Sequence, residues 1–131
     1  MLDCLIVGDS IAVGTAQHRK ECVSLSQGGI NSHDWNKKNA GNSVVARTVI
    51  ISLGSNDYRG VKTEAELQKL RELTKADRVF WILPAIKPHV QDIVRRVAAE
   101  HGDTVIPITK LQPDGVHPTS VGYKNIAEQT K

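Results

Sequence analysis

A serine near the start of the chain, and an aspartate and a histidine near its end, are the residue types of a nucleophilic catalyst. Ser10 follows an apolar run, whereas Asp114 and His117 lie three residues apart in a segment with glycine and proline. A serine hydroxyl attacks weakly unless a base takes its proton. A histidine held by a carboxylate is such a base, because the carboxylate fixes its tautomer and leaves the second ring nitrogen free. The three residues therefore predict acyl transfer through a serine, provided that folding brings them together.

Simpler structural roles also account for these residues. A serine at the start of a helix is a common N-cap. Asp114 and Gly115 form a dipeptide that is typical of turns, and Pro118 can preset the helix that follows. Both interpretations stay open on the sequence alone.

Further along the chain lie groups that can stabilise negative charge. Asn56 follows the most β-branched run of the sequence, and its side-chain amide can donate a hydrogen bond to an oxyanion. The backbone N–H groups of Ser10 and Gly29 are two more candidate donors, and a glycine lets a substrate approach the backbone closely. Preorganised donors of this kind stabilise the charge that develops on a carbonyl oxygen. Turns that end strands explain the same residues without chemistry.

Short apolar runs and helical patterns alternate along the chain. We expect strands over residues 5–7, 23–26, 48–53, 78–83 and 104–106. We expect helices over residues 11–19, from 63 onward, from 88 to 102 and over 119–130, whereas 32–38 stays open between helix and loop. Such alternation with short connections is typical of parallel strands joined by right-handed crossovers. The sequence therefore predicts a three-layer α/β/α sandwich with a five-stranded parallel sheet in the flavodoxin-like order 2-1-3-4-5.

The helix that begins near residue 63 has the clearest local signals. Thr63 and Glu66 have the spacing of a capping box, with Thr63 as N-cap. Leu67, Leu70 and Leu73 recur at helical spacing and are expected to face the core.

All the candidate residues follow predicted strands. In a parallel sheet, functional groups gather beyond the carboxyl ends of the strands. The loops after the first, second, third and fifth strands hold the serine, the glycines, Asn56 and the Asp-His pair. Residues 84–88 follow the fourth strand at the same edge and are expected to form a stiff wall of the site.

Length and charge narrow the possible functions. The chain has 131 residues, which predicts one domain over 1–131. Its formal net charge of +3 comes without a basic tract, so we expect no nucleic-acid partner. No run approaches the roughly 18 apolar residues of a membrane span, and no signal peptide is visible. We therefore expect no membrane association and a cytoplasmic or phage-associated protein.

Cys4 and Cys22 are the only cysteines. Without an export signal, two such thiols are expected to be buried and free rather than bridged. They would be neighbours if the first two strands pair, so their redox state stays open. No Cys/His cluster has the spacing of a zinc site, and we expect no metal.

Four segments, in this order, resemble the sequence blocks of SGNH (GDSL-type) hydrolases. The segment from Gly8 to Ile11 reads GDSI where the family has GDSL, residues 54–57 resemble its G-x-N-D block, and residues 114–118 (DGVHP) its D-x-x-H block. The remaining block is a glycine after the second strand, for which Gly29 is the best match and Gly28 the alternative. The resemblance covers most of the chain.

This resemblance implies a mechanism. Ser10 would be the nucleophile, His117 the base and Asp114 the acid that orients it. The oxyanion hole would consist of the Ser10 N–H, the Gly29 N–H and the Asn56 side chain. The reaction would be ester hydrolysis through an acyl-serine intermediate, without metal or cofactor.

The short chain leaves little room for an acyl tunnel. We therefore expect small acyl esters, above all O-acetyl esters, on a saccharide or another polar carrier. Trp35, Tyr58 and Arg59 are candidate substrate contacts, although Trp35 also suits a place in the core. Two other functions stay open: a lysophospholipase or thioesterase of the same class, and a catalytically idle SGNH-like binding or structural module.

Overall fold

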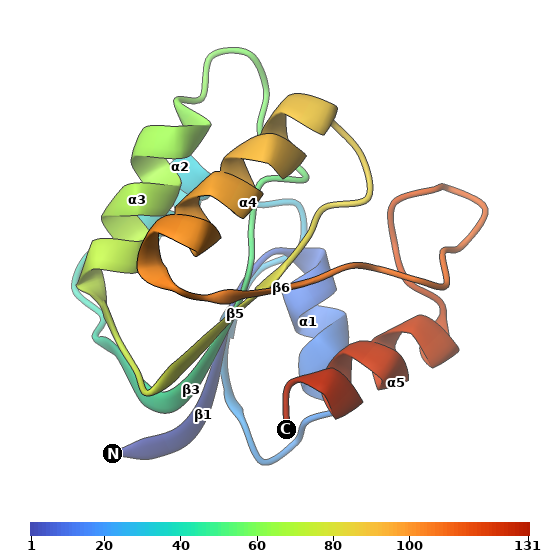
Figure 1. The fold of residues 1–131 in the computed structure, drawn as a ribbon, viewed down its shortest axis with the longest axis horizontal. Coiled ribbons are helices and arrows are strands. Elements are labelled where there is room, and N and C mark those ends of the chain that lie inside the picture. Colours follow the sequence, from blue (N-terminus) through green and yellow to red (C-terminus); the bar gives the residue numbers. More distant parts are fainter.

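A twisted parallel sheet forms the middle layer of the computed structural model, which describes residues 1–131 (Figure 1). Its strands are β1 (Leu2–Gly8), β2 (Val23–Ser26), β3 (Val44–Ser52), β4 (Thr74–Lys75), β5 (Arg78–Ile82) and β6 (Thr104–Ile106). The order is β2-β1-β3-β5-β6, and every pair is parallel. Apart from the short β4, this is the predicted order 2-1-3-4-5, which is therefore confirmed.

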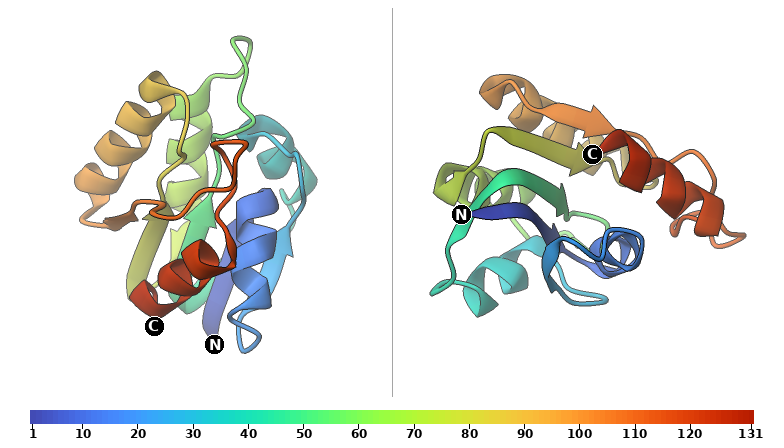
Figure 2. Two further views of the ribbon diagram at one scale, coloured as in Figure 1. Left: turned by 90° about the vertical axis from the view of Figure 1, so that its right-hand side faces the viewer. Right: turned by 90° about the horizontal axis from the view of Figure 1, so that it is seen from below.

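Helices cover both faces of the sheet (Figure 2). They are α1 (Ser10–Gln17), α2 (Ser32–Lys38), α3 (Thr63–Leu73), α4 (Pro88–His101) and α5 (Ser120–Gln129). Apolar residues of α2, α3 and α4 pack in one core cluster, whereas those of α1 and α5 pack in the other. The three-layer α/β/α prediction is confirmed. None of the five helices has the length and apolar character needed to cross a bilayer.

Strand β1 shows how the sequence produces two cores. Leu5 and Val7 face the cluster of α2, α3 and α4, whereas Cys4 and Ile6 face that of α1 and α5. A strand alternates its side chains between the two faces. Because helices cover both, the strand is apolar almost throughout, as is typical of parallel sheets.

The sheet is larger than expected along β3. This strand begins at Val44, four residues before the predicted start at Thr48, and its first two residues pair with β4. Strand β4 has two residues, too few to produce a periodic pattern. Residues 32–38, left open by the sequence, form the short helix α2, whose N-cap is the side chain of Asn31.

Two predictions for α3 are wrong. Its N-cap is Lys62, and Thr63 lies inside the first turn with its hydroxyl bonded to the carboxylate of Asp57. A tertiary hydrogen bond thus takes the group that the capping box would use. Leu73 is 58% exposed because it is the last residue of the helix, whereas Leu67 and Leu70 are buried.

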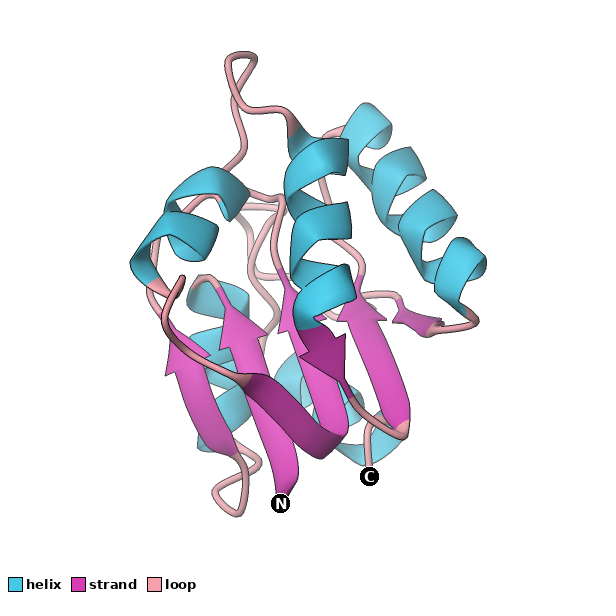
Figure 3. Cartoon of the chain, turned by 90° about the vertical axis from the view of Figure 1, so that its left-hand side faces the viewer, coloured by secondary structure: helices cyan, strands magenta, loops and turns pink.

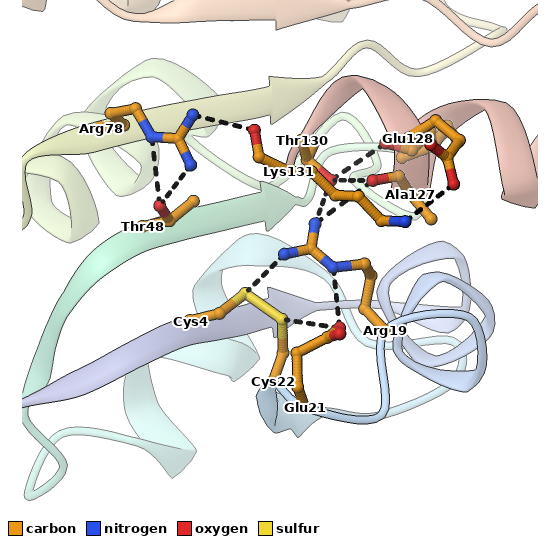
Figure 4. Close-up of polar contacts among 11 residues, drawn as sticks. Cys4, Arg19, Glu21, Cys22, Thr48, Arg78, Ala127, Glu128, Thr130 and Lys131 are labelled. Atoms are coloured by element: carbon orange, nitrogen blue, oxygen red, sulfur yellow. Dashed lines mark hydrogen bonds and ion pairs between the residues drawn. A yellow bond between two sulfur atoms is a disulfide. The ribbon is translucent and has the colours of Figure 1, made fainter.

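The two cysteines form a disulfide, so the prediction of free thiols is wrong (Figure 4). Strand β1 pairs with β2 from Leu5 onward, which places Cys4 beside Cys22 with their Cα atoms 4.6 Å apart. The buried guanidinium of Arg19 lies 3.8 Å from the Cys4 sulfur and donates to the Thr130 hydroxyl at 2.7 Å. Disulfides persist mostly in oxidising compartments, so this bond weighs against the cytoplasmic location expected from the sequence.

The carboxyl ends of the strands all point to one edge of the sheet (Figure 3). The loops that follow β1, β2, β3 and β6 begin there, although they are far apart in the sequence. This edge contains the candidate site.

Candidate active site

Ser10, His117 and Asp114 form one continuous chain of hydrogen bonds. The Ser10 Oγ lies 2.8 Å from Nε2 of His117, although the two residues are 107 positions apart in the sequence. The Nδ1 atom of the same ring lies 2.8 Å from Oδ2 of Asp114. The fold therefore brings these three side chains into direct contact.

Local hydrogen bonds fold the loop that holds Asp114 and His117. Gly115 adopts a left-handed φ of 70°, and its N–H donates to the Gln112 carbonyl at 2.9 Å. The Gln112 N–H in turn donates to the His117 carbonyl at 2.8 Å, and Pro118 is buried. A tight turn of this kind needs the glycine, because a side chain rarely adopts positive φ.

The carboxylate of Asp114 is exposed yet strongly stabilised. Its Oδ1 accepts the N–H groups of Val116 at 2.9 Å and of His117 at 3.0 Å. These two backbone bonds, with the side-chain bond to His117, lower the pKa of Asp114 to about 2. An ionised carboxylate can only accept, so Nδ1 of His117 is the protonated nitrogen and Nε2 accepts the Ser10 hydroxyl.

Ser10 is not the N-cap of α1, because Asp9 has that role. The Oδ1 atom of Asp9 accepts the Ile11 N–H at 3.0 Å and the Ser52 hydroxyl at 3.1 Å. Ser10 is the first residue of the helix, and its hydroxyl is therefore free to meet His117. The structural alternative for Ser10, a capping serine, is wrong.

A close approach of two strands explains the glycine before Asp9. Gly8 has a φ of 143°, and a Cβ built on it would lie 1.9 Å from the Ser52 carbonyl oxygen. The Asp9 N–H donates to that same oxygen at 2.9 Å. Glycine at position 8 thus lets β3 hold the turn that presents Ser10.

Asp9 is the one carboxyl group that is fully enclosed beside the candidate nucleophile. It has no exposed surface, and its Oδ2 makes no hydrogen bond. Burial raises the pKa of Asp9 to about 6, against the opposing effect of its backbone and Ser52 hydrogen bonds. The sequence placed Asp9 in the first block but contained no sign of this environment.

Asn56 lies in the loop after β3, with its side chain against the loop after β2. Its Nδ2 donates one hydrogen to the Ile30 carbonyl at 3.1 Å, which leaves the second amide hydrogen available. The loop is shaped by Gly54, whose φ is 114° and whose carbonyl accepts the Asp57 N–H at 3.1 Å. A Cβ at Gly54 would lie 2.6 Å from the Val90 side chain.

The buried carboxylate of Asp57, the residue after Asn56, connects the loop after β3 to α2 and α3. It accepts the Ser32 N–H at 2.8 Å, the Ser32 hydroxyl at 2.6 Å and the Thr63 hydroxyl at 2.8 Å. These bonds connect the end of β3 to the first turns of α2 and α3. Asp57 therefore fixes the loop without touching Ser10 or His117.

The two candidate glycines lie in the loop after β2, and Gly28 is the one next to Ser10. A Cβ at Gly28 would lie 3.9 Å from the Ser10 Cβ, so this residue faces the serine. Gly29 has a φ of 78°, and its N–H donates no hydrogen bond within the protein. The Gln27 N–H, bonded to the Gly8 carbonyl at 2.9 Å, ties this loop to the serine turn.

An open pocket of about 540 Å³ extends from these glycines over α2. Its lining residues are Gln27, Gly28, Gly29, Ile30, Asp34, Lys37 and Lys38. Ile30 is the single apolar residue among them. Gln27, Asp34, Lys37 and Lys38 therefore present polar and charged side chains to this pocket.

The predicted substrate contacts have different environments. Trp35 is 2% exposed and its Nε1 donates to the Leu25 carbonyl at 2.9 Å, so its ring lies in the core. Of the two roles that the sequence left open for Trp35, the structure shows the place in the core. Tyr58 and Arg59 are exposed in the loop beyond Asp57, and their contact with substrate stays a prediction.

Lys87 is a residue of this edge that sequence reasoning missed. It precedes α4 and donates from Nζ to the backbone of the Asn56 loop. The sequence indicated a stiff segment at residues 84–88 but not the direction of this side chain.

No family model matches the chain. No curated protein matches it either. Solved structures do match along nearly the whole length. An acylhydrolase structure from Bacteroides fragilis superposes with a TM-score of 0.68 at 20% identity, covering 98% of this chain and 85% of that one.

Two further solved structures are similar. A GDSL-like lipase from Parabacteroides merdae has a TM-score of 0.68 at 17% identity, over 95% of this chain and 91% of that one. The C-terminal catalytic domain of peptidoglycan O-acetyltransferase A from Streptococcus pneumoniae has a TM-score of 0.62 at 17% identity, over 96% of this chain and 88% of that one. At such identities the likeness establishes the fold, and the chain has the fold of SGNH (GDSL-type) hydrolases that its four sequence blocks implied.

Proposed function

We propose that the protein is a serine esterase that transfers a small acyl group from an ester to water. The observation that supports this most directly is the Ser10–His117–Asp114 chain, with two contacts of 2.8 Å. Its order of hydroxyl, imidazole and ionised carboxylate is the one that a serine needs to become a nucleophile.

In the acylation step, Nε2 of His117 takes the proton of the Ser10 hydroxyl as Oγ attacks the ester carbonyl carbon. The carbonyl oxygen becomes an oxyanion in a tetrahedral intermediate. His117 then gives its proton to the leaving alcohol oxygen, and the carbon–oxygen ester bond breaks. The product is an acyl-serine.

In the second half, His117 takes a proton from water, whose oxygen attacks the acyl-serine carbonyl. The new tetrahedral intermediate collapses, and the proton returns to Ser10 as the acid leaves. Asp114 stays ionised in both halves, since its pKa of about 2 lies far below neutral pH. Its charge stabilises the imidazolium that forms twice in the cycle.

Three donors would meet the oxyanion: the N–H of Ser10, the N–H of Gly29 and the Asn56 amide. Ser10 begins a helix, where backbone N–H groups lack helical partners and the helix dipole favours negative charge. The Gly29 N–H and one Asn56 hydrogen are unpaired within the protein. Such donors act without reorganisation at the moment of reaction.

The pocket beside Gly28 and Gly29 favours an acetyl ester on a polar carrier, such as a saccharide. Four of its lining side chains are polar or charged, and Ile30 is the one large apolar side chain that a fatty chain could contact there. One structural neighbour is named as a peptidoglycan O-acetyltransferase, which agrees with acetyl groups and a saccharide carrier. A lysophospholipase or thioesterase remains the alternative, and another neighbour is named as a GDSL-like lipase.

A series of p-nitrophenyl esters from acetyl to dodecanoyl tests this proposal. We expect kcat/KM to be highest for acetyl and to fall with chain length. A rate that rises toward long chains would instead support the lipid-directed alternative. Labelling with an organophosphonate distinguishes either kind of esterase from a catalytically idle module, because an idle site would leave Ser10 unlabelled.

A further inference from the structure

The side chain of Lys87 reaches across the edge of the sheet to the loop that holds Asn56. Its Nζ donates to the Ser55 carbonyl at 2.8 Å and to the Asp57 carbonyl at 2.7 Å. These two carbonyls belong to the residues immediately before and after Asn56. A single ammonium group therefore holds the backbone on both sides of the Asn56 side chain.

The backbone of Lys87 is also unusual. Its φ of 62° and ψ of 81° are left-handed, and it is the only residue other than glycine with positive φ. Such a conformation is unfavourable for residues with a Cβ, and glycine adopts it freely. Pro88 follows at once and begins α4, so the chain turns sharply at this point. The presence of lysine at a position whose backbone conformation favours glycine indicates that the lysine side chain has a role.

The carbonyls of Ser55 and Asp57 accept no hydrogen bond other than those from Lys87. The Ser55 hydroxyl is buried and makes no hydrogen bond. Asp57 is held through its carboxylate by α2 and α3. The Asn56 amide donates to the Ile30 carbonyl in the loop after β2. Without Lys87, the two peptide carbonyls around Asn56 would lose their charged donor.

We propose that Lys87 is a positioning residue for ester hydrolysis, which holds the Asn56 amide where the oxyanion forms. This inference rests on the function proposed above. Lys87 acts through the two carbonyls and touches neither the substrate nor the Ser10–His117 pair. Because the amide must meet the oxyanion at hydrogen-bond distance, a small displacement of the loop weakens transition-state stabilisation more than substrate binding.

Kinetics of Lys87→Met test the proposal, because methionine is unbranched, is only one atom shorter than lysine and removes the donor. With p-nitrophenyl acetate, we expect kcat to fall by about ten- to a hundredfold with little change in KM, less than loss of the donor itself costs. Lys87→Arg should restore part of the loss. Lys124→Met, at an exposed lysine of α5, is the matched control and should behave as wild type. An unchanged kcat in folded Lys87→Met would overturn the proposal.

A double-mutant cycle with Asn56→Ala separates positioning from a general loss of stability. If Lys87 acts through Asn56, adding Lys87→Met to Asn56→Ala should lower kcat by less than about twofold more. Full additivity of the two effects would contradict the proposal. Should Lys87→Met not fold, Lys87→Asn replaces it, since asparagine tolerates left-handed backbone but is too short to reach both carbonyls.

An NMR readout distinguishes this proposal from the proposed function. The side-chain amide signals of Asn56 should shift in Lys87→Met and stay in place in Lys124→Met, whether or not the protein hydrolyses the ester. If the wild type showed no hydrolysis that depends on Ser10, the proposed esterase function would be contradicted, but the role of Lys87 would not. Unmoved Asn56 signals in Lys87→Met would contradict the role of Lys87.

Discussion

The two carboxylates nearest Ser10 and His117 have opposite environments. Asp114 lies on an exposed turn, where backbone N–H groups lower its pKa to about 2. Asp9 lies under the first turn of α1 with no exposed surface, and burial raises its pKa to about 6. The exposed group is kept charged for the proposed chemistry. The buried group holds the serine turn in place, and its charge costs stability near neutral pH.

Removal of the Asp114 charge tests the role of the exposed carboxylate and should have the largest effect on kcat. We expect Asp114→Asn to lower kcat by about 10³–10⁴-fold, because the His117 ring loses the acceptor that fixes its tautomer. The melting temperature should change little. Steady-state kinetics with p-nitrophenyl acetate measure the loss, and the exposed Asp3→Asn is the control.

A kcat of Asp114→Asn close to wild type would reduce Asp114 to a turn residue. It would also remove the functional contrast between the two carboxylates.

The burial of the Asp9 carboxyl group predicts that the stability of the protein depends on pH. Between pH 3.8 and about 6, the folded state keeps the Asp9 proton that the unfolded chain releases. The contribution of Asp9 to the free energy of unfolding therefore falls as pH rises through this window, by about 3 kcal/mol at most. Asp9→Asn keeps a cap oxygen and has no charge to bury, so it should lack this fall.

Urea unfolding of wild type and Asp9→Asn at several pH values measures the difference. We expect the stability of wild type relative to the variant to decrease from pH 4 to pH 6. A difference that stays constant over this range would mean that Asp9 titrates normally, and the contrast with Asp114 would fail.

The disulfide joins β1 and β2 through Cys4, at the end of β1 away from Asp9 and Ser10. Replacing Cys4 and Cys22 together by serine opens a loop with a sequence separation of 18. We expect the free energy of unfolding to fall by about 2–3 kcal/mol. The kcat of the folded variant should stay near that of wild type, since the bond lies at the end of β1 away from Ser10 and since Asp114 and His117 lie on another loop.

Chemical denaturation with and without a reducing agent measures this effect. Equal stability of the wild type in both conditions would argue against a closed bond in solution.

Much of the fold could be predicted because strands and helices alternate with few exceptions. The two-residue β4 could not, because a pattern needs more residues than it has. The disulfide was missed because general expectations about the compartment outweighed the neighbouring positions of Cys4 and Cys22. For Trp35 the sequence left a substrate contact and a place in the core open, since nothing local distinguishes the two, and the structure shows the core.

In the candidate site, residue types and spacing identified the side chains that the structure places side by side: Ser10, Asp114 and His117. They could not identify what supports these residues. The cap formed by Asp9 requires the contact of β1 with β3, and the reach of Lys87 requires a left-handed residue before Pro88. Both depend on tertiary geometry.

The central claim is that the Ser10 hydroxyl attacks the ester, and hydrolysis of p-nitrophenyl acetate by Ser10→Ala tests it most directly. Ser120→Ala is a matched control, since Ser120 also begins a helix behind a capping residue. With all proteins shown to be folded by circular dichroism, we expect activity in wild type and Ser120→Ala and none above background in Ser10→Ala. Equal hydrolysis by wild type and Ser10→Ala would contradict the account.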